Sequence, residues 1–257
     1  LYFYTMKRLW IFLALFSCKQ YSDKVLVQNI GFAQGTTYNI QYMSPNAQDY
    51  QLEIDSILAR IDSSLSNYQD YSLISKLNQG DTNLILDIHF VNVFKAFQAV
   101  SKSTDGSFDC TLESLVNAWG FGSSEKENLD SIKIFSLLEN TGYNKLSLIG
   151  DSALYNPDLV KLDFNALAQG YTVDVIAAYF DSLGLKNYMV EVGGELKTKG
   201  KNANNKYWRI GIDRPSREID VDNRFQMVVE LSNRSLATSG NYRKFYIKEG
   251  KKYAHVI

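Results

Sequence analysis

The order of the hydrophobic patterns along the chain constrains its fold more than any other feature. Between residues 49 and 140, apolar side chains recur at the spacing of amphipathic helices, and beyond residue 187 they alternate as in strands. The expected helices cover 49–67, 89–104, 112–118 and 130–140, and the expected strands include 35–43, 187–192, 207–213 and 225–233. A helical part followed by a strand-rich part predicts an α+β fold, and 257 residues are enough to bury a substantial core.

The same patterns predict which side chains point inward and how some elements connect. The inward faces of the first two helices are expected to carry Leu52, Ile57 or Leu58, Ile61 and Leu65, and Phe90, Val93, Phe94, Phe97 and Val100. A strand over 159–163, a helix over 166–182 and the strand over 187–192, which ends at Gly193-Gly194, together resemble a crossover unit. Glu249-Gly250 predicts a hairpin turn between two strands.

The composition argues against two classes of function. Lys and Arg (27) nearly balance Asp and Glu (28), so no overall field favours nucleic acid. With only two His and two Cys, the chain lacks the closely spaced ligands that zinc sites use. The 17 Tyr and 14 Phe are most simply core and sheet residues, which leaves a few rings to stack on planar ligands.

The first residues have the layout of an export signal. Met6 opens "MKRLWIFLALFSC", a basic pair followed by an apolar run too short to span a bilayer as a stable helix. "LFSC" resembles a bacterial lipobox, in which Cys18 becomes the lipid-modified first residue, and the alternative is a buried N-terminal strand or helix. We expect upstream residues and a signal peptide over 1–17, a tether over 18–30 and one domain over 31–257. If Cys18 carries lipid, Cys110 has no partner for an internal disulfide.

The stretch "LDFNALAQGYTVD" (162–174) surrounds the start of a helix with polar groups. A helix N-terminus offers unpaired N–H groups that suit a phosphate, and Gly170 allows close approach. Asp163 and Gln169 are placed to bind the polar rim of a nucleotide. The structural alternative is that Asn165 caps the helix while Asp163 and Gln169 satisfy backbone groups.

Other short stretches add weaker signals, and each has an ordinary structural alternative. Tyr68 ends a helix where its ring can reach over a pocket, and Phe108 and Asp109 follow the tight turn at Gly106. "ATSGNYR" (237–243) places hydroxyl side chains beside a glycine, and His255 is the only histidine among the expected strands. None of these stretches decides the function alone.

Six blocks in series resemble the ApbE family, the FAD:protein FMN transferases. They are "TDGSFDCTLESLVNAWGFG", "LDFNALAQGYTVD", "YMVEVGGELKTKGKN", "WRIGIDRP", "ATSGNYRKFY" and "YAHVI". The resemblance covers roughly residues 31–257. It implies FAD in a cleft between a helical lobe and a strand-rich lobe, with Mg²⁺ at the diphosphate. FMN then passes to a Thr or Ser hydroxyl of a partner protein, and AMP is released.

The resemblance also implies roles for individual residues. It places Tyr68 beside the flavin, Ser107, Phe108 and Asp109 along the pocket, Asp163 and Gln169 on the nucleotide, the Ala166 carbonyl on Mg²⁺, and Ile257 at a flavin contact. His255 matches the histidine of "H-x-x-D-P" and is the candidate base for the acceptor hydroxyl. Such a lipoprotein would face the periplasm of a bacterial envelope and meet an exported acceptor there.

The chain departs from the family pattern at several positions. Many relatives carry Lys or Glu where Gln169 stands, and Gln34 replaces the Met usual before Gly-Thr. The family continues after "HVI" with "D-P-x-T-G" and an "A-D-A-x-x-T" block whose Asp and Thr complete the metal site, and neither block is in this sequence. We therefore expect a C-terminally truncated chain that binds FAD weakly, is poorly stable and is nearly inactive.

Two other functions stay open on the sequence. A metal-dependent FAD pyrophosphatase would use water in place of the protein hydroxyl, although an aromatic lid at Tyr68 should hinder water. A flavin-binding lipoprotein without catalysis is favoured if the metal ligands are truly missing.

The first prediction concerns Cys18. Expression from Met6 in a bacterial host should give a membrane-associated, acylated product, and Cys18→Ala should abolish acylation because the lipid attaches through the thiol. Metabolic labelling with a fatty acid checks this. Label retained in the Cys18→Ala protein would show that the lipobox interpretation is wrong.

Overall fold

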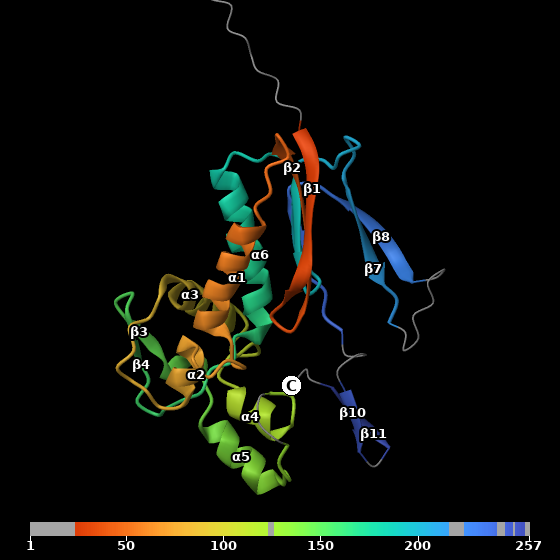
Figure 1. Cartoon of the computed structure of the whole chain (residues 1–257). Coiled ribbons are helices and arrows are strands. Elements are labelled where there is room, and N and C mark those ends of the chain that lie inside the picture. The colour runs from red at the N-terminus through yellow and green to blue at the C-terminus, as the bar shows by residue number, and fades with distance from the viewer. Residues whose placement is uncertain (1–23, 123–125, 216–223, 241–244, 249, 255–257) are drawn as a thin grey trace, which may run out of the picture.

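The computed structural model describes residues 24–122, 126–215, 224–240, 245–248 and 250–254. The helices are α1 (Gln51–Leu65), α2 (Leu73–Asn78), α3 (Ile88–Ser103), α4 (Glu113–Ala118), α5 (Ser131–Glu139) and α6 (Asn165–Ser182), with a 3-10 turn at Tyr143–Lys145. The strands are β1 (Lys24–Ala33), β2 (Thr36–Pro45), β3 (Ser147–Ile149), β4 (Ala153–Tyr155), β5 (Tyr188–Val192), β6 (Glu195–Lys199), β7 (Trp208–Asp213), β8 (Phe225–Leu231), β9 (Arg234–Leu236), β10 (Phe245–Lys248) and β11 (Lys251–Ala254). Helices and antiparallel sheets confirm the predicted α+β class (Figure 1).

The largest sheet has the strand order β1-β2-β5-β6-β9, and every neighbouring pair is antiparallel. Its centre is β5, which pairs with β2 from Tyr38↔Val192 to Tyr42↔Tyr188. The β5–β6 turn is Gly193-Gly194, whose φ angles of 66° and 104° are costly for any residue with a Cβ atom. The remaining strands form three separate hairpins, β3–β4, β7–β8 and β10–β11.

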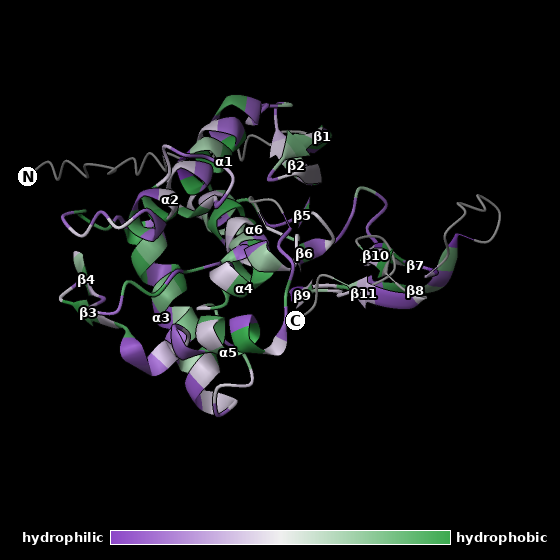
Figure 2. Ribbon diagram, turned by 90° about the horizontal axis from the view of Figure 1, so that it is seen from below, coloured by the Kyte–Doolittle hydropathy of each residue, from purple (hydrophilic) through white to green (hydrophobic). Residues whose placement is uncertain are grey.

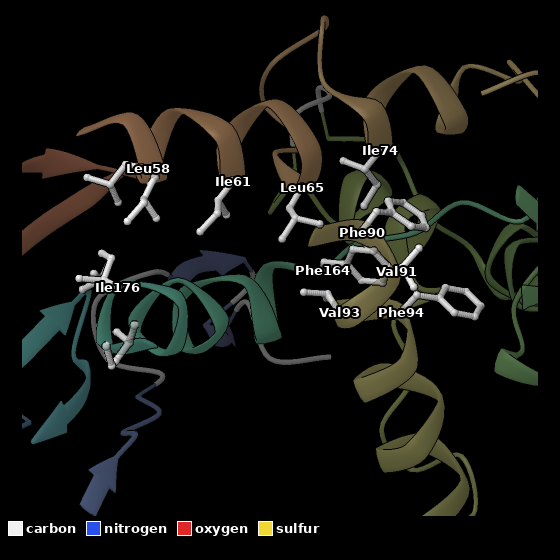
Figure 3. Packing of buried hydrophobic residues seen from close by; sticks show 14 of the residues in the cluster. Leu58, Ile61, Leu65, Ile74, Phe90, Val91, Val93, Phe94, Phe164 and Ile176 are labelled. Atoms are coloured by element: carbon white, nitrogen blue, oxygen red, sulfur yellow. The ribbon is translucent and has the colours of Figure 1, made fainter. Parts of the chain in front are cut away.

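Helix α6 lies in the middle of the molecule, between α1, α3 and strands β5 and β6 (Figure 2). Because it contacts neighbours on several sides, its apolar residues are not confined to one stripe. The core continues from Ile176 of α6, past Leu58, Ile61 and Leu65 of α1, to Phe90 and Phe94 of α3 (Figure 3).

The strand expected over 159–163 does not form, so the crossover unit was a wrong prediction. Side chains bind the backbone N–H and carbonyl of Leu162, the groups that would pair with a neighbouring strand in a sheet. The Leu162 N–H donates to Asn78 Oδ1 at 2.8 Å, and its carbonyl accepts from the side chains of Asn67 and Asn78, both at 2.8 Å. Strand β5 instead pairs antiparallel with β2 and β6.

Smaller corrections concern the edges of the predicted elements. The tether expected over 18–30 overlaps β1, which begins at Lys24; only Asn29 of this strand is buried, so no apolar alternation announced it. Leu52 is 81% exposed rather than inward, and Val100 is 38% exposed, so each lies off the packed face of its helix. The hairpin expected around 249–250 is confirmed by the pairing of β10 with β11.

Among the described residues, no helix combines the length and apolarity needed to cross a membrane.

Phe164 should be a major stabilising residue, because it is fully buried immediately before α6. Its ring centroid lies 5.3 Å from that of Phe90 and 6.2 Å from that of Phe97. Phe164→Ala should lower the free energy of unfolding by roughly 3–5 kcal/mol, as large-to-small changes of core aromatics do. Urea denaturation measures this. The matched control is Phe135→Ala, since Phe135 is 68% exposed on α5; equal losses in both variants would contradict the assignment.

Candidate functional site

The start of α6, residues 162–170, is here called the mouth of α6. It is built by three consecutive anchors. Leu162 is held by the two asparagine side chains, the Asp163 N–H donates to the Cys110 carbonyl at 2.8 Å, and Phe164 fills the core. Helix α6 begins at Asn165, so Asn165 is not its N-cap; Phe164 holds that position without a side-chain cap, and Asp163 Oδ1 accepts the Asn165 N–H at 2.8 Å. The Leu167 N–H donates to the Phe164 carbonyl at 2.8 Å, so two of the N–H groups that a helix N-terminus usually leaves unpaired already have partners here.

Tyr68, which the resemblance places beside the flavin, lies at this mouth, and the flavin contact itself stays a prediction. It follows α1, its side chain is 56% exposed, and its hydroxyl is hydrogen-bonded by the Asn165 side chain. Partial burial of the hydroxyl and the nearby negative charge of Asp163 raise its pKa, while the Asn165 hydrogen bond opposes the shift. An exposed ring with a fixed, protonated hydroxyl is suited to cover a planar ligand.

Asp163 is the electrostatic centre of the mouth. Burial raises its pKa, and the hydrogen bonds from Asn165 lower it in part. Burial raises the pKa of the Cys110 thiol and of the Glu113 carboxyl, and the negative charge of Asp163 raises both pKa values further. A buried carboxylate with few stabilising partners is a strong hydrogen-bond acceptor for hydroxyl groups. Shifted pKa values of this kind are common at functional sites.

Sequence reasoning missed Glu113. This residue is 8% exposed in α4, its Oε1 accepts from Asn117 Nδ2 at 2.6 Å, and its Oε2 has no hydrogen-bond partner among the described residues. The positive charge of Lys161 lowers its pKa against the larger effect of burial. Nothing in the pattern around residue 113 indicated a buried carboxyl, because an acidic residue in the first turn of a helix is ordinary.

Gln169 connects the mouth to the β5–β6 turn. A Cβ atom on Gly193 would lie 2.8 Å from Gln169 Nε2 and 2.9 Å from Thr36 Cγ2, so the amide rests directly on the glycine. Gln34, in the β1–β2 turn at φ 52°, donates to Thr172 Oγ1 at 2.8 Å. The buried Gln34 Oε1 has no partner among the described residues. Both strand turns are therefore fastened to the first half of α6.

Two further acidic residues at the β5–β6 turn were also missed. Burial raises the pKa of both Glu191 and Glu195, and Glu191 Oε1 accepts the Gly194 N–H at 2.8 Å. The charge of Glu191 adds to the shift of Glu195, whose Oε2 is buried without a partner among the described residues. The "EVGGE" pattern could have indicated this pair, because the tight glycine turn returns the second Glu close to the first.

The loop 107–110 approaches the mouth through its backbone rather than through the predicted side chains. Asp109 Oδ1 accepts the Thr111 N–H at 2.8 Å and Oδ2 accepts the Tyr143 N–H at 2.9 Å, so this carboxylate fixes the loop. Phe108 packs partly against the core and Ser107 is exposed. Flavin contacts of Ser107, Phe108 and Asp109 stay predictions.

Ala166 lies exposed in the first turn of α6, where its carbonyl is a hard oxygen ligand of the kind that Mg²⁺ prefers. No group of three or more His, Cys, Asp or Glu side chains within the described part of the chain is arranged to hold a metal ion. Ala166 is the one magnesium ligand that the resemblance predicts among the described residues. Cys18, His255 and Ile257 lie outside the described residues.

Together, the mouth offers the positive end of the α6 dipole for a phosphate, an aromatic ring for a planar group, and a carboxylate and an amide for hydroxyl or N–H groups. Tyr68 lies near Asp163 and Asn165 although about a hundred residues separate them in the sequence, and Gln169 lies farther along the same helix, against the β5–β6 turn. These groups are of the kinds that bind a nucleotide with a planar ring.

Known proteins share the sequence pattern and the fold of this chain. A model of the ApbE family matches residues 34–257. The FAD:protein FMN transferase of Vibrio cholerae is 32% identical over 254 residues, which cover 95% of this chain and 74% of that protein. The FAD:protein FMN transferase of Haemophilus influenzae is 30% identical over 264 residues, with 95% and 74% covered.

Solved structures give the same result. Flavin transferase ApbE from Vibrio cholerae has a TM-score of 0.78 at 33% identity and covers 91% of this chain and 76% of that chain. The apo form of Pseudomonas stutzeri flavinyl transferase ApbE has a TM-score of 0.79 at 30% identity, with 91% and 74% covered. Fold and sequence thus point to one family.

The raised pKa of Asp163 predicts a pH-dependent stability difference. The native state binds this proton more tightly than the unfolded chain, whose Asp titrates near about 3.9. The stabilisation is therefore complete below that value and is lost as the pH rises through the folded pKa. Asp163→Asn, which keeps an acceptor for the Asn165 N–H, should be more stable than the wild type at pH 7.

Urea denaturation between pH 4 and pH 8 checks this expectation. The advantage of Asp163→Asn should be largest at pH 8 and should disappear towards pH 4, whereas the exposed control Asp70→Asn should show no such trend. A wild type more stable than Asp163→Asn at pH 7 would contradict the electrostatic argument.

Proposed function

Because this chain belongs to the ApbE family, we propose that it transfers FMN from FAD to a hydroxyl group of a partner protein. The observation that carries the proposal is the position of Tyr68 near Asp163 at the mouth of α6, with Gln169 on the same helix against the β5–β6 turn. Relatives from Vibrio cholerae and Haemophilus influenzae carry the name FAD:protein FMN transferase.

The reaction forms a bond between the acceptor oxygen and the phosphorus of the FMN half of FAD. It breaks the bond from that phosphorus to the bridging oxygen, and AMP leaves with this oxygen and its electron pair. The acceptor hydroxyl loses its proton to a base. The product is a protein with FMN attached through a phosphodiester bond.

The residues at the mouth bind and orient FAD for this reaction. The exposed ring of Tyr68 stacks on the isoalloxazine, which positions the FMN half and restricts water. Asp163 accepts a hydrogen bond from a hydroxyl group of the nucleotide. Gln169, which rests against the β5–β6 turn, binds a second polar edge of the nucleotide. The N–H groups at the start of α6 face the diphosphate, whose charge the helix dipole favours. His255 takes the acceptor proton, a role that rests on its match to the family histidine.

Mg²⁺ belongs to this proposal as the ion that neutralises charge on the diphosphate. Its support is the chemistry of FAD and the position of the Ala166 carbonyl beside the expected phosphates. The acceptor is proposed to be an exported or membrane protein with a Thr or Ser at the flavinylation site. The support is the signal-like sequence before Cys18, which also implies a lipid-anchored enzyme on the periplasmic side.

Incubation with FAD, Mg²⁺ and an acceptor domain tests the proposal. We expect covalent flavin on the acceptor, seen as in-gel fluorescence and a mass increase, together with equimolar AMP. EDTA should abolish both products, and an acceptor whose target Thr is replaced by Val should stay unlabelled.

The products distinguish the alternatives. Free FMN and AMP without labelled acceptor would indicate a pyrophosphatase, and unchanged FAD would indicate a binding protein. Either result would contradict the proposed transfer.

A further inference from the structure

Glu113 carries a buried carboxyl group of which only one oxygen has a partner among the described residues. The residue is 8% exposed, its Oε1 accepts a hydrogen bond of 2.6 Å from Asn117 Nδ2, and its Oε2 is buried without a partner there. Buried polar groups of native proteins nearly always have partners, so an exception requires an explanation. A carboxylate only accepts hydrogen bonds, and the group that satisfies Oε2 is therefore a donor.

The surroundings of Asn117 fix which oxygen of Glu113 is free. A Cβ atom on Gly122 would collide with Asn117 Oδ1, so the amide is confined between the turn after α4 and Glu113 Oε1. The free oxygen is then Oε2, and this arrangement holds it in place.

Glu113 follows the loop that holds the mouth of α6. The Cys110 carbonyl, three residues earlier, accepts the Asp163 N–H at 2.8 Å. The charges of Asp163 and Lys161 both act on the Glu113 carboxyl, and these two residues flank Leu162 in the chain. A buried carboxyl with a free oxygen thus lies within electrostatic reach of the residue that begins the mouth.

A second free acceptor belongs to the same anchor. Asn67 Nδ2 donates to the Leu162 carbonyl at 2.8 Å, which turns Asn67 Oδ1 away from that carbonyl. This oxygen is also buried without a partner among the described residues. The free polar atoms of Asn67 and Glu113 are both acceptors, so they match a ligand that brings hydrogen-bond donors.

The sugar parts of FAD bring such donors. Its ribityl chain and its ribose carry adjacent hydroxyl groups, and acidic side chains are common partners of nucleotide hydroxyls. Phosphate oxygens do not donate, and a carboxylate repels them. Protein atoms cover Oε2, so a neighbouring side chain moves when a hydroxyl reaches it, and the exposed side chain of Lys161 can move without unpacking the core.

We propose that Glu113 is a second sugar-binding carboxylate of the mouth. Its Oε2 accepts a hydrogen bond from a hydroxyl group of the ribityl chain or the ribose of FAD, while Asp163 binds another hydroxyl of the same ligand. This inference rests on the proposed function, because it adds a contact to the nucleotide that the mouth is proposed to bind.

Glu113→Gln, made in residues 1–257, tests the proposal by titration with FAD at pH 8, followed by flavin fluorescence. The amide keeps an acceptor for Asn117 and replaces Oε2 by a donor, so we expect Kd to rise at least fivefold. A carboxylate that was merely a nearby charge would have the opposite effect, because its removal would reduce repulsion of the diphosphate and lower Kd. The matched control Glu139→Gln removes an exposed charge on α5 and should leave Kd within twofold.

Separate ligands locate the hydroxyl group. Weaker binding of FMN but not of AMP assigns the contact to the ribityl chain, and the reverse assigns it to the ribose. Lumiflavin, which has the ring without a sugar chain, should bind both proteins equally. In urea, Glu113→Gln should be at least as stable as the wild type, because a buried charge with one free oxygen is removed.

An unchanged or lower Kd for FAD in Glu113→Gln would overturn the proposal. So would an equal loss of lumiflavin binding, or a loss of stability in parallel with affinity, which would indicate a structural role. Absence of FAD binding by the wild type is a different result, which counts against the proposed function itself.

Discussion

The site depends on how Leu162 is held. This residue is fully buried, and its N–H and carbonyl are bonded by the side chains of Asn67 and Asn78 rather than by a neighbouring strand. A buried backbone group without a partner costs about 1–3 kcal/mol. Because the two asparagine side chains supply these hydrogen bonds, the chain can cross the core here without joining a sheet. Because the chain is released from the sheet here, it can turn directly into α6. Asp163 is then left at the helix start, beside Tyr68 and Cys110.

The sequence predicted elements well where one periodic face packs against one neighbour. The boundaries of α3 and α5 differ from the expected ranges by one residue at each end, and Phe90, Phe94 and Phe97 are buried as expected. It failed where side chains replaced backbone partners. The apolar run before Asp163 resembles a strand in composition, and only the distant Asn67 and Asn78 decide otherwise. Strand β1 was not predicted, because an edge strand with one buried residue shows no alternation of apolar and polar side chains.

The candidate site shows the same division. Tyr68, Asp163 and Gln169 were indicated by residue type and by family resemblance, and the fold brings Tyr68 near Asp163, with Gln169 farther along the same helix. Glu113, Glu191 and Glu195 were not indicated, since their significance lies in burial, which no local pattern reports. Asp109 has a structural role that the sequence did not indicate, because each of its oxygens accepts a backbone N–H and ties the loop to Tyr143. Its contact with a ligand stays a prediction.

One short segment, residues 109–122, links the mouth of α6 to the β10–β11 hairpin. At its start the Cys110 carbonyl accepts the Asp163 N–H, and in its middle the charge of Asp163 raises the pKa of Glu113, whose Oε1 accepts a hydrogen bond from Asn117. At its end Asn117 fills the space beside Gly122, and Trp119 and Phe121 stack on Tyr253 and Tyr246 of the hairpin. The Glu113 carboxyl is buried among these contacts with one oxygen that has no partner among the described residues, so its burial costs stability.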